Sequence, residues 1–481
     1  MKKVTLTFGL TLTLMLATNT SIFAQWDGNG SSADPYLIKT VTDLANLAYA
    51  VNTGYDNFSG KFFRLENDLD LNVPPYNTDK GWTPIGKYTD IEYPFSGNFN
   101  GNGKKISNLY VHSGARHQGV FGYANGATIE NLGVENVDIL YADHAGGVIG
   151  ALVNSSVSNC YTTGKLLHND CSGGVVGYVY DGSISNCYST VEVVGNPAGS
   201  VAGGIVGGVN GVVGSSISNC YSIGEIHGIG VGSIVGVINA YSSDSVTNCA
   251  ALSPCVVRNG SILEPPPAAG RVLGQAYSYT LSNNIAFDSM LNKDGNTIWY
   301  HKGLDQIDGA DISKEFIKTD STLGGRFTSP VWTTKAGKLP GLFGNTVDMP
   351  VHFQDPIPPQ ITTVSLPNGT VGTAYSATLT ADGNTPITWS FEGDTLSKAG
   401  LFFTPNGSIS GIPVKDGIFY ITVKATNVAG SDVKAFSINI GSVGIVGANG
   451  IRPEIRIYPN PAKNQLQVTS YELRVTREYG N

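Results

Sequence analysis

Short apolar runs separated by clusters of glycine, asparagine and serine fill the middle of the chain, and they recur in a fixed order. Between residues 119 and 249 the chain reads GVFGYANGATIENLGV, GGVIGALVNSSVSNCY, GGVVGYVYDGSISNCY, GGIVGGVNGVVGSSISNCY and GSIVGVINAYSSDSVTNCA. The glycine that closes each Gly-x-x-Gly-like phrase falls at Gly122, Gly150, Gly177, Gly207 and Gly236, in steps of 28, 27, 30 and 29 residues. Self-similarity at a period of about 20–50 residues is typical of a solenoid, a propeller or another array.

Each repeat holds two apolar runs of β type, such as residues 174–179 and 183–187, with turn-forming residues between them. Apolar residues with helical spacing do not occur inside a repeat. A propeller blade has four strands and usually needs about 40 residues, whereas a repeat of about 28 residues fits one coil of a parallel β-helix. We therefore predict an all-β protein built on a right-handed parallel β-helix (β-solenoid), with coils about 4.8 Å apart.

Columns of equivalent residues follow from aligning the second half of each repeat, at residues 129–132, 157–160, 184–187, 217–220 and 246–249. The first position is β-branched and is expected to point inward. The third is always asparagine, whose amide can hydrogen-bond its copy one coil away: Asn131, Asn159, Asn186, Asn219 and Asn248. The fourth is Leu132 and then cysteine, which predicts a column of buried thiols: Cys160, Cys187, Cys220 and Cys249.

The repeated phrase resembles the GLUG repeat of bacterial surface proteins, which form β-helices, and the resemblance covers roughly residues 26 to 345. Trp82-Thr83-Pro84-Ile85-Gly86 and the run from Phe95 to Gly103 are similar to the segments that lead into GLUG repeats. Val331-Trp332 before Lys338-Leu339-Pro340 is similar to the usual ending of the family. The resemblance implies a bacterial surface protein with a β-helical body.

Residues 25–116 are expected to form the N-terminal cap and first coils, residues 117–286 the GLUG-like repeats, and residues 287–354 the C-terminal cap of the solenoid. Thr42 or Asp43 is expected near the start of one capping helix. An amphipathic apolar stripe predicts this helix: Leu44, Leu47, Ala48 and Val51. It would cover the open end of the core, which is otherwise an exposed edge. The expected anchors of the C-terminal cap are Trp299, Trp332, Leu339 and Leu342.

Residues 355–359 form a stiff Pro-rich linker, and residues 360–441 behind it alternate apolar and polar positions. Four runs of strand type recur at regular spacing: residues 374–379, 387–391, 419–423 and 435–440. This pattern predicts a β-sandwich with Trp389 at its centre. The phrases around Tyr375, Trp389 and Ile409 resemble the immunoglobulin-like modules of bacterial surface proteins. The segment contains no cysteine, so an inter-sheet disulfide is excluded.

Both ends of the chain carry patterns that are typical of export. Residues 1–24 place two lysines, an apolar run and small residues before Gln25, as a secretory signal peptide does. Residues 442–481 contain a linker and a phrase that resembles the opening of the C-terminal sorting signal of type IX secretion in Gram-negative bacteria: Tyr458, Pro459, Asn460 and Pro461. The resemblance ends after about twelve residues, so we interpret the signal as truncated. These patterns predict a protein that is secreted or displayed on the outer cell surface.

Composition narrows the possible partners and cofactors. The formal net charge is −8, with few basic clusters, which argues against nucleic acid and anionic membranes. After the signal peptide, no run approaches the roughly 18 apolar residues of a membrane span. His144, His168 and His227 stand alone, and neither Cys-x-x-Cys nor His-Glu-x-x-His occurs, so we expect no metal and no other cofactor. A disulfide through Cys171 or Cys255 is an alternative to free thiols.

A carbohydrate-active enzyme is the alternative function, because parallel β-helices often resemble polysaccharide lyases or hydrolases. A lyase needs a base beside a carboxylate and usually a cation that holds the acid group. Between His117 and Val257, however, the chain has no arginine, and Lys165 is its one lysine. The acids there are scattered, although a hydrolase pair stays possible. We therefore predict no catalytic residues.

Tyrosines form the candidate binding surface. They follow the leucine or cysteine column, and strand alternation sends their rings outward, one coil apart: Tyr110, Tyr161, Tyr188 and Tyr221. Such a ladder can stack on sugar rings, and the alternative is a structural ladder of ring on ring. We predict adhesion or glycan binding, with a cell-surface or matrix polysaccharide, or a host or neighbouring surface protein, as partner. A purely structural spacer is a further alternative.

Overall fold

The computed structural model describes residues 26–88, 92–196, 199–239, 243–259, 269–393 and 395–442. The predicted signal peptide and the sorting phrase (Tyr458, Pro459, Asn460 and Pro461) lie outside the described residues. The chain divides into two compact units between Gln354 and Asp355. Each unit has a hydrophobic core of its own.

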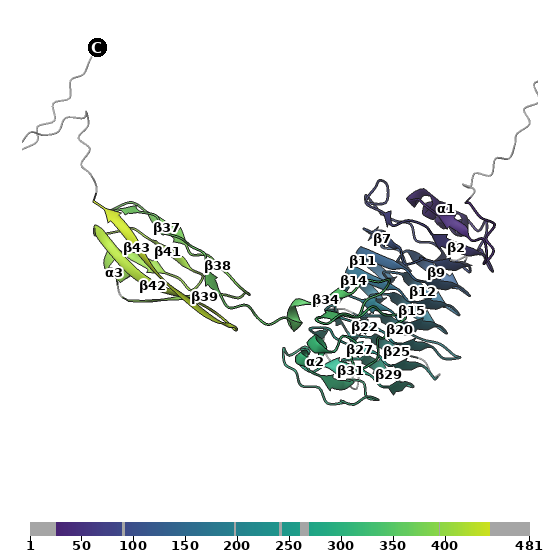
Figure 1. The fold of residues 1–481 in the computed structure, drawn as a ribbon. Helices are drawn as coiled ribbons and strands as arrows, with labels where there is room; N and C mark the ends of the chain where they lie inside the picture. The colour runs from purple at the N-terminus through teal and green to yellow at the C-terminus, as the bar shows by residue number, and fades with distance from the viewer. Residues whose placement is uncertain are drawn as a thin grey trace, which may run out of the picture. The chain divides into compact units, whose positions relative to one another are not determined.

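The first unit is a β-solenoid of about nine turns, whose coils contribute strands to three parallel sheets (Figure 1). Equivalent positions of successive coils lie in register, as Ile129, Val157 and Ile184 do, and all three side chains are fully buried. The solenoid and its inward β-branched column are therefore confirmed.

The first two sheets run from the first coils to the last ones, whereas the third spans residues 121–276. The first contains β1 (Tyr36–Ile38), β2 (Phe62–Leu65), β6 (Asn98–Asn100), β10 (Thr128–Glu130), β13 (Ser156–Ser158), β16 (Ser183–Ser185), β21 (Ser216–Ser218), β26 (Ser245–Thr247) and β30 (Thr280–Ser282). The second contains β3 (Leu69–Asp70), β7 (Lys105–Ser107), β8 (Tyr110–Val111), β11 (Gly133–Gly146), β14 (Tyr161–Gly173), β17 (Tyr188–Ser189), β18 (Glu192–Gly195), β19 (Val201–Gly203), β22 (Tyr221–Ser222), β23 (Ile226–Gly228), β24 (Gly230–Gly232), β27 (Ala250–Ala251), β28 (Val256–Arg258), β31 (Ile285–Phe287) and β32 (Ala310–Ile312). The third contains β9 (Phe121–Asn125), β12 (Ile149–Val153), β15 (Val176–Tyr180), β20 (Val206–Val209), β25 (Val235–Ile238) and β29 (Leu273–Ala276).

The asparagine column lies at the turn that follows the first sheet. Asn131, Asn159, Asn186, Asn219 and Asn248 all have φ between 52° and 58°, in the left-handed region that asparagine tolerates better than most side chains. Asn159 Nδ2 donates to Asn131 Oδ1 at 2.9 Å, and Asn248 donates to Asn219 in the same way. The column thus combines a required backbone conformation with amide contacts between coils.

The N-terminal end is covered by α1 (Val41–Asn52), and the predicted apolar stripe of this helix is buried in the core. Its N-cap is Thr40, and Thr42 and Asp43 lie in its first turn, near the cap as expected. Asp43 is the third helical residue, and its carboxylate accepts a hydrogen bond from the Thr40 amide at 2.9 Å in a capping box. Among the described residues α1 is the longest helix, with 12 residues, and no helix there is long and apolar enough to cross a membrane.

The C-terminal cap segment, residues 313–354, packs against the outer side of the second sheet as well as on the last coils. Phe343 contacts the ring of Tyr161, and the imidazole of His352 lies 2.9 Å from the carbonyl oxygen of Leu252. Trp332, Leu339 and Leu342 are buried, and Trp299, which precedes this segment, is partly buried against the core. The elements here are α2 (Lys314–Thr319), β33 (Lys338–Leu339), β34 (Val347–Asp348) and the 3₁₀ helix η1 (Val351–Phe353).

The second unit is a small β-sheet module with Trp389 in its core, 8% exposed. Gly407, at φ 83°, lies against the indole, where a Cβ atom would come within 3.0 Å of the ring. The central hairpin pairs β42 (Gly417–Asn427) with β43 (Gly430–Gly441) over eleven residue pairs. The elements of the second unit are β35 (Gln360–Ile361), β36 (Gly369–Thr370), β37 (Tyr375–Thr378), β38 (Ala381–Asp382), β39 (Thr388–Glu392), α3 (Thr395–Ala399), β40 (Leu401–Phe403), β41 (Ser408–Gly411), β42 (Gly417–Asn427) and β43 (Gly430–Gly441).

Candidate functional site

The tyrosine column forms a stack on the outer face of the second sheet. Tyr161, Tyr188 and Tyr221 are register partners. Their ring centroids are 5.0 and 5.2 Å apart, with interplanar angles of 4° and 5°. Tyr110 was expected in the same column, and this was wrong: it pairs with Asp138, which pairs with Lys165. The column of Tyr161 continues instead through Gly133 to Lys105. The ring of Tyr110 lies 3.8 Å from that of His112. The rings therefore point away from the solenoid core, as strand alternation requires.

The expectation that these rings form an exposed sugar-stacking strip was wrong for two of them. Tyr188 is 6% exposed and Tyr221 is 0% exposed, because the C-terminal cap segment lies over them. Trp332 packs on both rings, and the Tyr221 hydroxyl donates to the carbonyl of Pro340. Tyr161 is half-buried and donates to Glu135 at 2.8 Å. The stack therefore supports the docking of the cap segment.

The cysteine column lies inside the solenoid. Cys160, Cys187, Cys220 and Cys249 are fully buried, and each thiol contacts the backbone carbonyl two residues earlier, at 3.1–3.3 Å. All six cysteines are free thiols in this structure. Cys171 is buried as well, and this burial raises the pKa of its thiol.

A hollow of about 760 Å³ lies at the first coils of the solenoid, and we call it the N-terminal hollow. Its wall comes from the end of α1, from the loop and short strand at residues 80–88, and from the loop at residues 113–118. The strand is β4 (Lys87–Tyr88), which pairs with β5 (Glu92–Tyr93). Three exposed cations line the hollow: Lys80, Lys87 and Arg116. This cluster was not expected in a chain with a net charge of −8.

Aromatic side chains form one side of the N-terminal hollow. Tyr88 is 39% exposed, and its ring meets those of His117 and Tyr123 edge-on, at 5.5 and 5.3 Å. His117 stacks on His144 of the next coil at 5.0 Å, and His144 lies 5.0 Å from the ring of Tyr178. The column of rings holds Tyr88 from one side and leaves more than a third of it accessible.

The imidazoles in this column are neutral. The pKa of His117 is lowered to about 3, mainly by burial and also by its neighbours His144 and Arg116. Burial also lowers the pKa of His144, although Asp170, 3.3 Å from its Nε2, opposes the shift. The positive charge of the N-terminal hollow is therefore carried by its lysines and its arginine.

Two buried polar atoms on the wall have no hydrogen-bond partner among the described residues: Asn52 Oδ1 and His117 Nδ1. His117 also has φ 58°, a conformation that is uncommon outside glycine and costs about 1–3 kcal/mol. Unpaired buried groups and backbone strain both concentrate where a protein meets a ligand. Within the part of the chain that the structure describes, Arg116 is the one of these three cations in an ion pair, at 3.5 Å from Asp143, and both side chains are largely exposed.

Sequence reasoning missed the N-terminal hollow because its cations come from two loops and the short strand β4, which lie outside the repeats. The histidine column could have been found. His117, His144 and Cys171 are each 27 residues apart, which matches one coil, and the structure places them in one column. His144 was expected to stand alone, and it does not.

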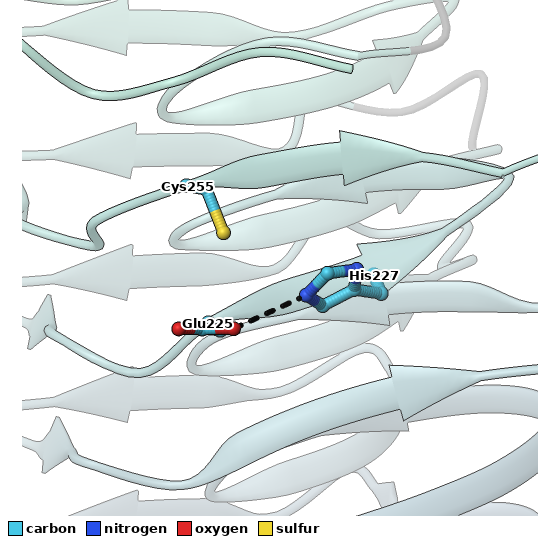
Figure 2. A group of neighbouring side chains, drawn as sticks. All are labelled: Glu225, His227 and Cys255. Carbon is cyan, nitrogen blue, oxygen red and sulfur yellow. Dashed lines mark ion pairs between the residues drawn. The ribbon is translucent and has the colours of Figure 1, made fainter. Parts of the chain in front are cut away.

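Among the residues that the structure describes, one group of side chains could hold a metal ion. Glu225, His227 and Cys255 come from two adjacent coils, and their ligand atoms all lie within 4.8 Å of one another (Figure 2). The expectation that His227 stands alone was therefore wrong, because its neighbour Cys255 lies a full coil away in sequence. His168, by contrast, is a buried core histidine, 2% exposed.

Comparison with known proteins supports both units. A family model described as "The GLUG motif" matches residues 168–194, and one described as "Putative Ig domain" matches residues 358–441. The solenoid is similar to a solved structure titled as a putative immunoglobulin A1 protease from Bacteroides ovatus. That structure is 23% identical with a TM-score of 0.52, and the match covers 66% of this chain and 95% of that one. This likeness shows the fold alone.

Two curated proteins match parts of the sequence. Halomucin of Haloquadratum walsbyi is 33% identical over 153 residues, and a "Putative Gly-rich membrane protein" of Evansella cellulosilytica is 30% identical over 140 residues. The matches cover 30% and 29% of this chain, but only 2% and 15% of those proteins. The similarity is therefore local.

Proposed function

We propose that this protein is a cell-surface or secreted β-solenoid that binds an acidic polysaccharide in its N-terminal hollow. The observation that carries the proposal is the gathering of Lys80, Lys87 and Arg116 around one hollow of an acidic chain. Arginine and lysine are the side chains that recognise carboxylate and sulfate groups. The signal-peptide pattern of residues 1–24 supports the extracellular location.

Aromatic and polar groups of the N-terminal hollow support a sugar ligand rather than a simple anion. The accessible part of Tyr88 offers a flat apolar face for a pyranose ring, beside the cations that would pair with its acid group. The unpaired Asn52 Oδ1 is buried in the wall, so a sugar hydroxyl can donate to it only after the wall shifts. A volume of about 760 Å³ has the size of a ligand pocket, which suits a short stretch of polysaccharide.

A binding assay tests the proposal. The secreted chain is titrated with a polyuronate, a sulfated polysaccharide and a neutral glucan, at low and high salt. Binding is expected to the acidic polymers and not to the glucan, and it should weaken with salt because exposed charges are screened. Binding to the neutral glucan alone would overturn the proposal, as would failure to bind any polymer.

Neutralising the cations localises the site. The triple variant Lys80→Ala, Lys87→Ala, Arg116→Ala should lose about 10–100-fold in affinity, because each exposed charge contributes up to about 1 kcal/mol. The matched control replaces three exposed lysines that do not line the hollow: Lys335, Lys415 and Lys424. Equal losses in both variants would indicate attraction by net charge only and would contradict a site in the hollow.

A polysaccharide lyase is the second candidate function, because the same hollow brings Tyr88 and a neutral His117 beside Arg116. A lyase needs a base together with a cation that stabilises the acid group. Acidic polymers incubated with the chain would then gain the ultraviolet absorbance of an unsaturated uronate. Product that disappears in Tyr88→Phe favours the enzyme, and binding without product favours the binder.

A further inference from the structure

The two coils at β23 and β28 place three different metal-binding side chains on one outer surface. Ile226 pairs with Val256 one coil on, and both side chains are fully buried. Because neighbours along a strand face opposite sides, the residues that flank this pair point outward. Glu225 and His227 flank Ile226, and Cys255 precedes Val256. The three therefore share one face by the same alternation that builds the core.

The side chains converge on the space between the two coils. Figure 2 shows Cys255 extending its sulfur toward the coil that carries Glu225 and His227. His227 Nε2 lies 3.5 Å from Glu225 Oε2, and all three ligand atoms lie within 4.8 Å of one another. Donors around a tetrahedral zinc ion, at roughly 2.0–2.3 Å from the metal, are about 3.3–3.8 Å apart. Small side-chain rotations close that difference, since Glu225 is exposed and His227 and Cys255 are half-buried.

We propose that Glu225, His227 and Cys255 form a zinc-binding site that links two adjacent coils. The donor set selects the ion: a thiolate and an imidazole favour Zn²⁺ over Mg²⁺ or Ca²⁺, which take oxygen ligands. Water completes the coordination, because the site is open to solvent. The side chains of Glu225 and His227 are 53% and 26% exposed.

Neighbouring groups are compatible with a three-residue site. Glu192, one coil before Glu225, is engaged by Lys165 at 3.0 Å. His352 has its Nε2 2.9 Å from the carbonyl of Leu252, which can only accept, so that nitrogen is already used as a donor. Neither residue is needed as a ligand. The site is independent of the N-terminal hollow, whose wall comes from other residues.

Cobalt substitution tests the site on the untagged, reduced, full secreted chain. Co²⁺ reports its ligands directly, because a thiolate ligand adds a charge-transfer band in the near ultraviolet. We expect one Co²⁺ per chain with this band, displaced by one equivalent of Zn²⁺. The band should disappear in Cys255→Ser. His227→Gln should weaken Co²⁺ binding by about a hundredfold or more, since even the loss of a residue that only orients a metal ligand costs about 10–100-fold in affinity.

Control variants keep the test decisive. Cys171→Ala removes the other cysteine outside the buried column, and Glu192→Gln removes a neighbouring carboxylate, so both should bind Co²⁺ as the parent does. Circular dichroism confirms that each variant is folded. The proposal is overturned if the parent shows no thiolate band, if the band survives in Cys255→Ser, or if a folded Cys171→Ala loses it.

Discussion

Tyr221 donates a hydrogen bond from its buried hydroxyl to the backbone carbonyl of Pro340, a residue 119 positions later in the chain. The contact joins the middle of the solenoid to the C-terminal cap segment. Together with Trp332, which packs on Tyr188 and Tyr221, it explains why an outward-facing aromatic column is closed to solvent. The tyrosines therefore hold the cap in place.

Tyr221→Phe should lower the free energy of unfolding by about 1–3 kcal/mol, because the carbonyl of Pro340 would stay buried without its donor. Urea unfolding measures this change. Tyr141→Phe is the matched control, since Tyr141 is 62% exposed and should tolerate the loss of its hydroxyl. Equal stability of the two variants would show that the hydrogen bond contributes nothing to cap docking.

The asparagine column should respond to backbone and side-chain changes separately. Asn159→Ala should destabilise by about 1.5–3 kcal/mol, since it loses the amide contact with Asn131 and forces alanine to φ 52°. Asn159→Gly keeps the left-handed backbone and should be the milder change. Thermal unfolding of the two Asn159 variants shows which of them is less stable. A glycine variant that is less stable than the alanine variant would contradict the backbone argument.

Much of the solenoid could be predicted because its signals recur once per coil. The position of Ile129 repeats at Val157 and Ile184, and one register fixes all three as core residues. The cover over Tyr188 could not be predicted, because the cap segment has no period. Nothing in the sequence around its anchor Trp332 indicates which coil this side chain packs on.

Cysteine accessibility follows from burial. In the native protein the four column thiols should not react with a thiol reagent, because each is fully enclosed: Cys160, Cys187, Cys220 and Cys249. After denaturation without reductant, at least these four should titrate as free thiols. Fewer than two free thiols would favour a disulfide-bonded protein instead.

Acid should destabilise the protein through its buried histidines. His117 and His168 both have pKa values lowered to about 3 by burial, whereas an unfolded histidine titrates near pH 6.5. The unfolded state therefore binds more protons between these values, and stability falls as pH decreases from about 6.5 toward about 3. Each histidine adds up to about 1.4 kcal/mol per pH unit to this slope.

His168→Leu isolates one of the two contributions, because both nitrogens of His168 lack partners among the described residues. Urea unfolding at several pH values should give a shallower slope below pH 6.5 for this variant than for the parent. Identical slopes would mean that His168 titrates normally in the folded protein and is not buried as described.

The N-terminal hollow marks the limit of sequence prediction for the site. Lys80 and Arg116 are 36 positions apart, in two loops of different length, and nothing in the repeat relates them. Only the folded coils bring them to one wall. The zinc candidates show the opposite case, since Glu225 and Cys255 are one coil apart and an alignment of columns could have paired them.

Hydrogen–deuterium exchange of the full secreted chain, with and without an acidic oligosaccharide, tests the central claim most directly. If the N-terminal hollow binds the sugar, protection should increase at residues 80–88 and 113–118 and should be absent from the same segments in the variant lacking Lys80, Lys87 and Arg116. Binding without protection in these two segments, or with protection confined to residues 355–442, would contradict the account.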